Sequence, residues 1–196
     1  ILLLSTCSIL FFIYTGFAMT VRRKKNAIPV NDFNQISAEY VILVGSETGN
    51  TFKLASLLFD SLKKIQKKVF ITDLNKYSHF SNLKHLLILT ATYGKGEAPA
   101  NGNQFSEKVK SLQSTHKVRF SVLGFGSLSY PDFCQFAIDI DKLLQKKTNF
   151  EQTIPLHKVH NQNFNDFLKW TTAWSEKTKV PIHFEAKEET PKNLIP

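Results

Sequence analysis

The sequence predicts an α/β fold in which a doubly wound parallel sheet is covered by helices on both faces. Short, wholly apolar runs such as residues 40–44 and 86–90 are typical of strands that are buried on both sides. The longer segments between them repeat apolar side chains at helical spacing. Strands that alternate with helices along a chain predict parallel pairing, because each crossover places a helix on the sheet.

The first half of the expected domain contains three strands. Residues 40–44 form a continuous apolar run that ends at Gly45 and predict the first strand. A helix is expected from about Asn50, because apolar side chains there keep helical spacing while lysines occupy the opposite side. Residues 69–73 are the predicted second strand, and residues 86–90 are the third.

The second half continues the alternation. Residues 105–112 predict a short helix, and residues 118–124 predict the fourth strand. A helix with one apolar face follows at residues 133–144. Residues 153–156 are a weaker candidate for a fifth strand, and residues 164–174 predict the last helix.

The first 21 residues carry no charge and lead into four consecutive cations, at 22–25. A helix of that length would span roughly 30 Å, the hydrocarbon thickness of a bilayer. A cleaved signal peptide would carry its basic residues before the apolar run, not after it. We therefore expect a single transmembrane helix over 1–21, a basic tether over 22–37, a domain on the cytoplasmic side of the membrane over 38–177 and a linker over 178–196.

Charge and cysteine usage restrict the functional class. The net charge of +9 suggests an anionic partner. One alternative function is an adaptor that binds nucleic acid or lipid and holds no cofactor, and only this charge supports it. Many lysines lie on one side of the predicted helices and are more simply a solvated face, so we expect no nucleic-acid partner. Neither the two cysteines, Cys7 and Cys134, nor the six histidines have metal-ligand spacing, so we expect no disulfide and no metal site.

Three segments that follow predicted strands contain the candidate binding residues. Ligands of doubly wound sheets bind outside the carboxyl ends of the strands, where the strand order reverses. The first segment, residues 45–51, is rich in Ser and Thr and opens a helix, which suits a phosphate held by neutral donors. An ordinary helix cap is the alternative. A triphosphate-binding P-loop would need a lysine that this segment lacks.

The other two segments, residues 90–99 and 123–133, each present a tyrosine at the same edge of the sheet. Tyr93 stands in the first and Tyr130 in the second. Either ring alone is more simply a packing residue. Two rings on neighbouring strand ends, beside a phosphate loop, predict a planar phosphorylated ligand.

Together, these segments resemble the FMN-binding loops of the flavodoxin-like domain of diflavin reductases. The similar stretches are residues 46–51, 91–99 and 126–130. Residues 129–136 are especially similar to the flavoprotein subunit of sulfite reductase, and NADPH-cytochrome reductases belong to the same group. The resemblance covers about residues 38–177. It implies a five-stranded parallel sheet in the order 2-1-3-4-5 that binds FMN non-covalently.

The resemblance also implies which residues bind FMN. The first loop would hold the phosphate, Tyr93 and Tyr130 would lie on opposite faces of the isoalloxazine ring, and Gly94 would place its backbone near flavin N5. The sequence departs from the family at Lys95, where an acid is usual. The full expected set is Ser46, Glu47, Thr48, Gly49, Asn50, Thr51, Ala91, Thr92, Tyr93, Gly94, Phe125, Gly126, Ser127, Leu128, Ser129, Tyr130, Phe133 and Cys134.

The resemblance implies the FMN module of a membrane-anchored, NAD(P)H-dependent diflavin-type oxidoreductase, similar to PepSY-type membrane reductases. It would pass single electrons from the reduced FAD of a reductase module to an acceptor. That acceptor is expected to be acidic or membrane-bound, because residues 38–177 carry 18 basic against 12 acidic side chains. A stand-alone, membrane-tethered flavodoxin is the alternative. No catalytic acid, base or nucleophile is expected, since FMN would supply the redox chemistry.

Overall fold

A computed structural model describes residue 9 and residues 11–16, 29–111 and 116–184. The strands are β1 (Tyr40–Gly45), β2 (Val69–Asp73), β3 (His85–Ala91), β4 (Val118–Gly126), β5 (Phe150–Gln152) and β6 (His157–His160). The helices are α2 (Asn50–Lys64), α3 (Phe105–Ser111), α4 (Gln135–Gln145) and α5 (Phe164–Thr178), with a short 3-10 helix at Leu74–Lys76. The predicted alternation of strands and helices is confirmed.

All strands of the sheet are parallel, and their order is β2-β1-β3-β4-β5, as predicted. β6 also pairs with β4. The chain crosses from β1 to β2 on one side and continues from β3 on the other, so the order reverses between β1 and β3. The carboxyl ends of these two strands therefore form the crevice in which doubly wound sheets bind ligands.

The fifth strand does not lie where the sequence predicts it. Residues 153–156 separate two short strands, of which β5 pairs with the first residues of β4 and β6 with its last residues. Pro155 lacks the N–H that a continuous ladder requires. Thr153 and Ile154 are buried, and the Thr153 N–H donates to Phe120 O over 2.8 Å. The apolar character of this segment thus reflects packing rather than strand pairing.

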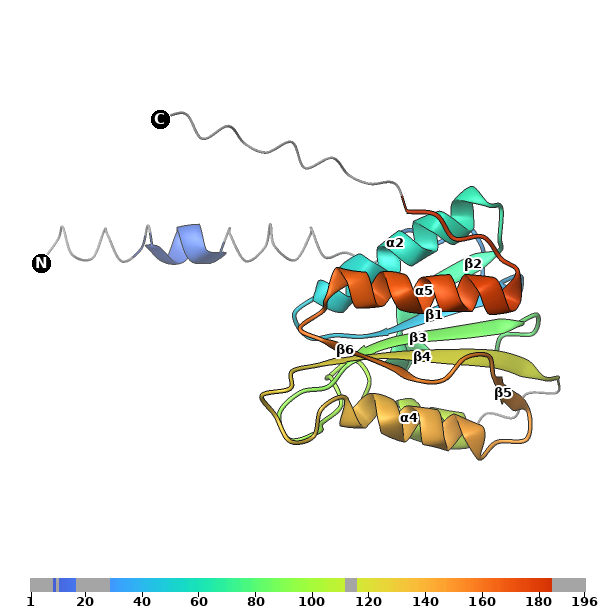
Figure 1. Cartoon of the computed structure of the whole chain (residues 1–196). Coiled ribbons are helices and arrows are strands. Elements are labelled where there is room, and N and C mark those ends of the chain that lie inside the picture. The colour runs from blue at the N-terminus through green and yellow to red at the C-terminus, as the bar shows by residue number, and fades with distance from the viewer. Residues whose placement is uncertain (1–8, 10, 17–28, 112–115, 185–196) are drawn as a thin grey trace, which may run out of the picture.

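Helices cover both faces of the sheet, with α2 and α5 on one face and α4 on the other (Figure 1). The α2–α5 layer buries Phe59, Trp170 and Trp174 against the sheet. Phe105 of α3 and Ile140 of α4 belong to the core on the opposite face. Every residue of β1 and β3 is buried, which accounts for their continuous apolar runs.

The predicted transmembrane helix is wrong. In the described part of the N-terminal segment, residue 9 and residues 11–16 are helical. No helix within the described ranges is long and apolar enough to cross a bilayer. The expected membrane localisation, with a single span and a cytoplasmic domain, is contradicted by this finding. The remaining residues of 1–21 and the basic cluster at 22–25 lie outside the described residues.

Segments on either side of the sheet domain pack against it. The side chain of Asn31 bonds to both backbone groups of Ile71, donating to its O over 2.9 Å and accepting from its N–H over 2.7 Å, and so covers the outer edge of β2. Ser61 of α2 bonds in the same way to the backbone O and N–H of His183, over 3.0 and 3.1 Å. The packed region therefore includes residues on both sides of the expected range 38–177.

His85 is a buried imidazole at the amino end of β3. Its ring stacks on Tyr40, with 4.9 Å between ring centroids, and meets Trp174 edge-on. Burial, helped by the positive charge of Arg119, lowers the pKa of His85 to about 4 from 6.5. The folded state therefore binds this proton more weakly than the unfolded state does. Stability from this group is full above pH 6.5 and is lost as the pH falls toward 4.

We expect the free energy of unfolding to fall by on the order of 2 kcal/mol between about pH 7 and about pH 5 through His85. The variant His85→Phe keeps a ring against Tyr40 but cannot titrate. Urea unfolding at both pH values should show a smaller loss for this variant than for the wild type. Equal losses in the two proteins would contradict this role of His85.

Candidate functional site

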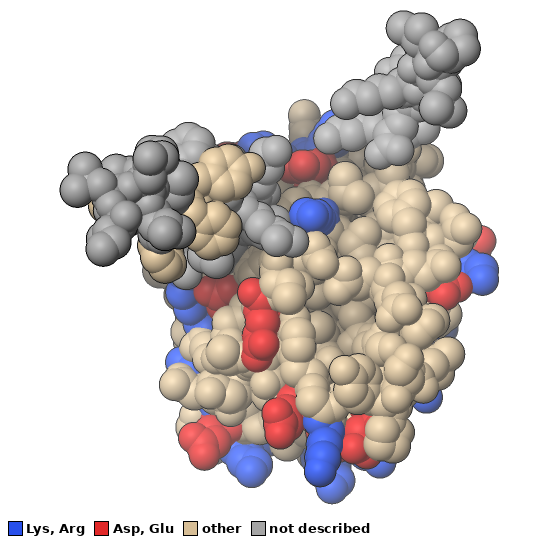
Figure 2. All heavy atoms as spheres, turned by 90° about the vertical axis from the view of Figure 1, so that its left-hand side faces the viewer, with Lys and Arg blue, Asp and Glu red and all other residues tan. Residues whose placement is uncertain are grey.

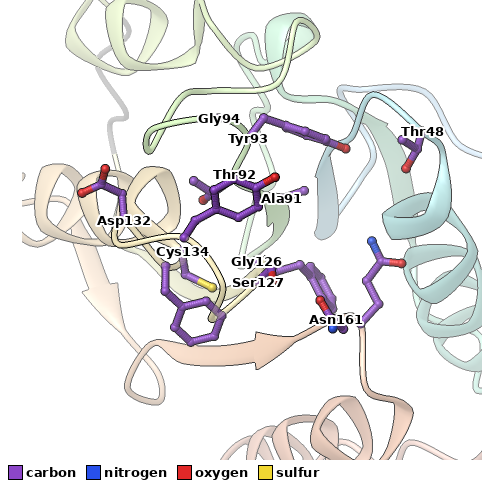
Figure 3. A pocket seen from close by; sticks show the side chains of 14 residues that line it. Thr48, Ala91, Thr92, Tyr93, Gly94, Gly126, Ser127, Asp132, Cys134 and Asn161 are labelled. Carbon is purple, nitrogen blue, oxygen red and sulfur yellow. The ribbon is translucent and has the colours of Figure 1, made fainter.

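A pocket of about 270 Å³ lies at the carboxyl ends of β3 and β4, where predicted residues of all three loops meet (Figure 3). Figure 3 places Asp132 at one end and Thr48 at the other. The predicted residues that line the pocket are Thr48, Ala91, Thr92, Tyr93, Gly94, Phe125, Gly126, Ser127, Tyr130, Phe133 and Cys134. Most of this face of the molecule consists of side chains that are neither acidic nor basic (Figure 2).

Some predicted residues do not line the pocket. These are Ser46, Glu47, Gly49, Asn50, Thr51, Leu128 and Ser129. Those from the first loop surround the start of α2, beside the pocket. Leu128 belongs to the loop after β4, and its side chain is 64% exposed.

Three lining residues escaped the sequence prediction: Asp132, Asn161 and Gln162. Asp132 lies within the third predicted segment, between Tyr130 and Phe133. Asn161 and Gln162 follow β6, and a strand predicted at 157–160 would have pointed to them, since ligand residues follow strand ends. Both have positive φ angles, 45° and 56°.

The loop after β1 leads into the start of α2, where backbone N–H groups are available to an anion. Gly49, which precedes the helix, has φ +81°, and its N–H donates to Ser46 Oγ over 3.0 Å. The first turn of α2 carries no acidic side chain, so nothing there competes with an anion for the free N–H groups. The hydroxyl of Thr51, in that turn, is buried and has no hydrogen-bond partner within the described residues.

Tyr93 joins the first loop to the second. Its hydroxyl accepts a hydrogen bond from the N–H of Glu47 over 3.0 Å. Its backbone pairs with that of Glu97 through bonds of 3.0 and 2.7 Å, which close a tight turn over residues 94–96. Gly94 and Gly96 adopt φ +50° and +85° in this turn, a conformation that favours glycine. The ring of Tyr93 is therefore held in place at the wall of the pocket.

Asn101 ties the ends of β1 and β2 to the second loop. Its Oδ1 accepts from the N–H of Ser46 over 2.8 Å. Its Nδ2 donates to Val44 O over 3.2 Å and to Asp73 Oδ1 over 3.0 Å. One half-buried amide thus fixes the point at which the chain leaves β1 for the candidate phosphate loop.

The loop after β4 returns close to its own strand. A Cβ atom on Gly126 would lie 3.0 Å from the backbone N of Cys134 and 3.1 Å from Cδ2 of Phe133, so this close approach favours glycine. Cys134 has φ +59°, and α4 begins one residue later, at Gln135, rather than at 133 as predicted. Burial raises the pKa of the Cys134 thiol to about 11, which keeps it uncharged beside the pocket.

The site therefore combines a pocket with aromatic lining and a neighbouring helix start that suits an anion. Tyr93 and Tyr130 supply aromatic surface, Gly94 and Gly126 allow close approach of the backbone, and the start of α2 supplies N–H donors. In the part of the chain that the structure describes, no cluster of three His, Cys, Asp or Glu side chains could hold a metal ion.

Comparison with known proteins identifies the family to which the chain belongs. The family model described as flavodoxin matches residues 42–170. The chain is 29% identical over 157 residues to the flavoprotein alpha-component of the NADPH sulfite reductase of Neisseria meningitidis serogroup B, covering 78% of this chain and 24% of that protein. It is 39% identical over 107 residues to the inducible nitric oxide synthase of Canis lupus familiaris, covering 53% and 9%. The chain spans a quarter or less of these relatives.

Solved structures show the same fold. The flavodoxin of Streptococcus pneumoniae TIGR4 superposes with a TM-score of 0.62 at 24% identity, over 71% of this chain and 97% of that one. Oxidised flavodoxin 1 of Bacillus cereus superposes with a TM-score of 0.61 at 18% identity, over 72% and 98%. Because the family match runs from the first buried strand into the last helix, the chain belongs to the flavodoxin family, and its cofactor is FMN.

Proposed function

We propose that this chain is the FMN-binding electron-transfer module of a diflavin-type oxidoreductase. It would receive electrons from the reduced FAD of an NAD(P)H-dependent module and pass them singly to an acceptor. The observation that carries this proposal is the similarity to the sulfite reductase flavoprotein component, which extends over 78% of the chain. The excess of 18 basic over 12 acidic side chains in residues 38–177 favours an acidic acceptor.

The residues at the site fit FMN. Buried hydroxyl groups normally have a hydrogen-bond partner, yet Thr51 Oγ1 and Thr92 Oγ1 have none within the described residues. Thr51 stands in the first turn of α2, where N–H groups and the helix dipole favour a phosphate. Thr92 lines the pocket between Ala91 and Tyr93. A ligand with a phosphate and a polar ring would supply both missing partners.

FMN, when bound, supplies the redox chemistry. The chain's own residues would bind and orient it. The first loop and Thr51 would hold the phosphate, while Tyr93 and Tyr130 would shield the ring from water. Tyr130 is 57% exposed, so this side of the pocket stays open to a partner protein that delivers or receives electrons. No side chain of the site needs to take part as an acid, a base or a nucleophile.

A stand-alone flavodoxin electron carrier is the second candidate. It is favoured by the solved structures, since the chain covers 97% and 98% of two flavodoxins. The two candidates differ in what is joined to the chain. A reading frame that continues beyond Pro196 into an FAD- and NAD(P)H-binding module would support the diflavin reductase and contradict the stand-alone carrier.

Anaerobic stopped-flow spectroscopy of the FMN-loaded chain tests electron transfer itself. We expect no reduction by NADPH alone, because the proposal assigns NAD(P)H oxidation to a separate FAD-containing module. Adding a catalytic amount of a purified flavodoxin reductase, an FAD enzyme, should lead to reduction, and cytochrome c should then reoxidise the chain. Direct reduction by NADPH, or no reduction in the presence of the reductase, would contradict the proposal.

A further inference from the structure

His160, the last residue of β6, is joined to the loop that follows β4. Its Nδ1 accepts a hydrogen bond from the backbone N–H of Leu128 over 3.1 Å. Its ring also meets the ring of Phe133 edge-on, with 6.3 Å between centroids and an interplanar angle of 72°. His160 therefore contacts residues near both ends of the 127–133 loop, which carries Tyr130.

The middle of the 127–133 loop is held by few other hydrogen bonds and by little burial. The N–H of Ser129 donates to Ser127 Oγ over 3.2 Å, and the N–H of Tyr130 donates to Ser127 O over 3.1 Å, so these two bonds stay within the loop. The side chains of Leu128 and Tyr130 are 64% and 57% exposed and contribute little burial. The bond to His160 thus ties this part of the pocket wall to the sheet.

The bond fixes the protonation state of the imidazole. A backbone N–H can only donate, so Nδ1 of His160 must carry no proton, and in the neutral ring the proton is on Nε2. The amide of Asn161 lies 3.2 Å from Nε2. The near atom of that amide is Nδ2, and a half-turn of the amide would bring Oδ1 there to accept from the Nε2 proton. Asn161 itself lines the pocket, and its N–H donates to Gly126 O over 2.9 Å.

We propose that His160 is a positioning residue that holds the 127–133 loop in its FMN-binding conformation, and that it does so only while its ring is neutral. A second proton on Nδ1 would point at the N–H of Leu128, and the acceptor would be lost. This inference rests on the FMN site proposed above. It adds a pH-dependent hydrogen bond between the Leu128 N–H and His160 Nδ1, here called the latch, which the sequence motifs did not indicate.

Lys158 and Asp132 are charged residues beside Phe133, whose ring meets that of His160. The Nζ of Lys158 lies 5.6 Å from the centroid of the Phe133 ring that meets His160. Asp132 precedes Phe133 in the loop and lines the pocket. Among the described residues, no carboxylate is paired with the imidazole. Protonation therefore removes the bond to Leu128 and supplies no ion pair in its place. A second proton on the ring would therefore release this part of the loop.

Two substitutions of His160 test the hydrogen-bond acceptor for the Leu128 N–H separately from the titratable imidazole ring. His160→Asn places an amide oxygen one bond from Cγ, as Nδ1 is, and cannot titrate. His160→Gln moves that oxygen one atom further from the backbone and out of line with Leu128. At about pH 8, we expect wild type and His160→Asn to bind FMN equally and His160→Gln to bind about 3- to 10-fold more weakly, the effect of one lost hydrogen bond. Flavin fluorescence titration of the full chain measures the dissociation constants.

Toward about pH 5.5, the dissociation constant of the wild type should rise about 3- to 10-fold relative to that of His160→Asn. Comparing the two at each pH cancels the ionisation of the FMN phosphate, which has a second pKa near about 6. His157→Asn, at the other end of β6, is the matched control and should keep the pH dependence of the wild type. A constant ratio between wild type and His160→Asn would overturn the proposal, as would His160→Asn binding as weakly as His160→Gln at about pH 8.

Hydrogen exchange of the Leu128 amide in the FMN-free protein gives an independent readout. The amide should be protected in wild type at about pH 8 and in His160→Asn at both pH values, and unprotected in wild type at about pH 5.5. If even the wild type binds no FMN, the proposed function fails and this exchange still decides the latch. If the variants do not fold, the pH dependence of exchange in the wild type alone decides it. A protection factor that is the same at both pH values would overturn the latch.

Discussion

Replacing Thr51 by valine is expected to weaken FMN binding by about 10- to 100-fold while leaving the FMN-free protein at least as stable as the wild type. Valine has nearly the shape of threonine but lacks the hydroxyl, which is buried and has no partner within the described residues. A hydrogen bond to a charged group is worth about 1.5–3 kcal/mol, and each 1.4 kcal/mol is about tenfold in affinity. Fluorescence titration measures the first effect and urea unfolding of the FMN-free chain measures the second.

Thr153→Val is the matched control for this prediction. Its hydroxyl is also buried without a partner among the described residues, but it lies between β5 and β6, away from the pocket. We expect this variant to keep the FMN affinity of the wild type. Thr92→Val should be intermediate, at about 2- to 10-fold, because its ligand partner is expected to be uncharged. If Thr51→Val and Thr153→Val bound FMN equally well, the assignment of Thr51 to the phosphate would be wrong.

Asn101→Asp is expected to lower the free energy of unfolding by about 2–4 kcal/mol at neutral pH. The change keeps the acceptor for the Ser46 N–H but removes the donor to Val44 O and to Asp73. It also places a carboxylate directly against those two oxygens, so lost hydrogen bonds add to charge repulsion. The loss should become smaller at acidic pH, where a protonated carboxyl group can donate again.

Urea unfolding across pH tests this, with Asn165→Asp as the control. Asn165 is exposed in the first turn of α5, so the same change of charge there should be neutral or slightly stabilising. FMN affinity should also fall in Asn101→Asp, since Ser46 opens the phosphate loop. A stability for Asn101→Asp that equals that of Asn165→Asp at neutral pH would show that the three bonds of Asn101 do not hold the loop.

The sheet was the most predictable part of the fold, for a physical reason. Strands buried on both faces must be apolar at every position, and β1 and β3 are fully buried, so short apolar runs identified them directly. Their order came from the resemblance of the three loops, not from periodicity. The region after β4 was less predictable because β5 and β6 are three and four residues long and are only partly buried. Strands this short carry no distinct pattern.

The site residues, too, were predictable only where the preceding strand could be recognised in the sequence. Motif residues such as Thr92 and Tyr93 were predicted because they stand directly after a strand that the sequence reveals. Asn161 was missed because the strand before it was placed too early. The N-terminal run shows the opposite error, since apolar length and the basic cluster at 22–25 predicted a membrane span, whereas no helix among the described residues is long and apolar enough to be one. Composition constrains what a segment can do, but the contacts it makes decide what it does.

The most direct test of the central claim, that this chain binds FMN through a phosphate loop and an aromatic pocket, is a titration of the FMN-free chain with FMN and with riboflavin. Riboflavin has the same ring but no phosphate. The site predicts one FMN per chain, bound at least about 100-fold more tightly than riboflavin, because several hydrogen bonds to a charged group are lost together. Equal affinity for the two flavins, or no binding of either, would contradict the claim.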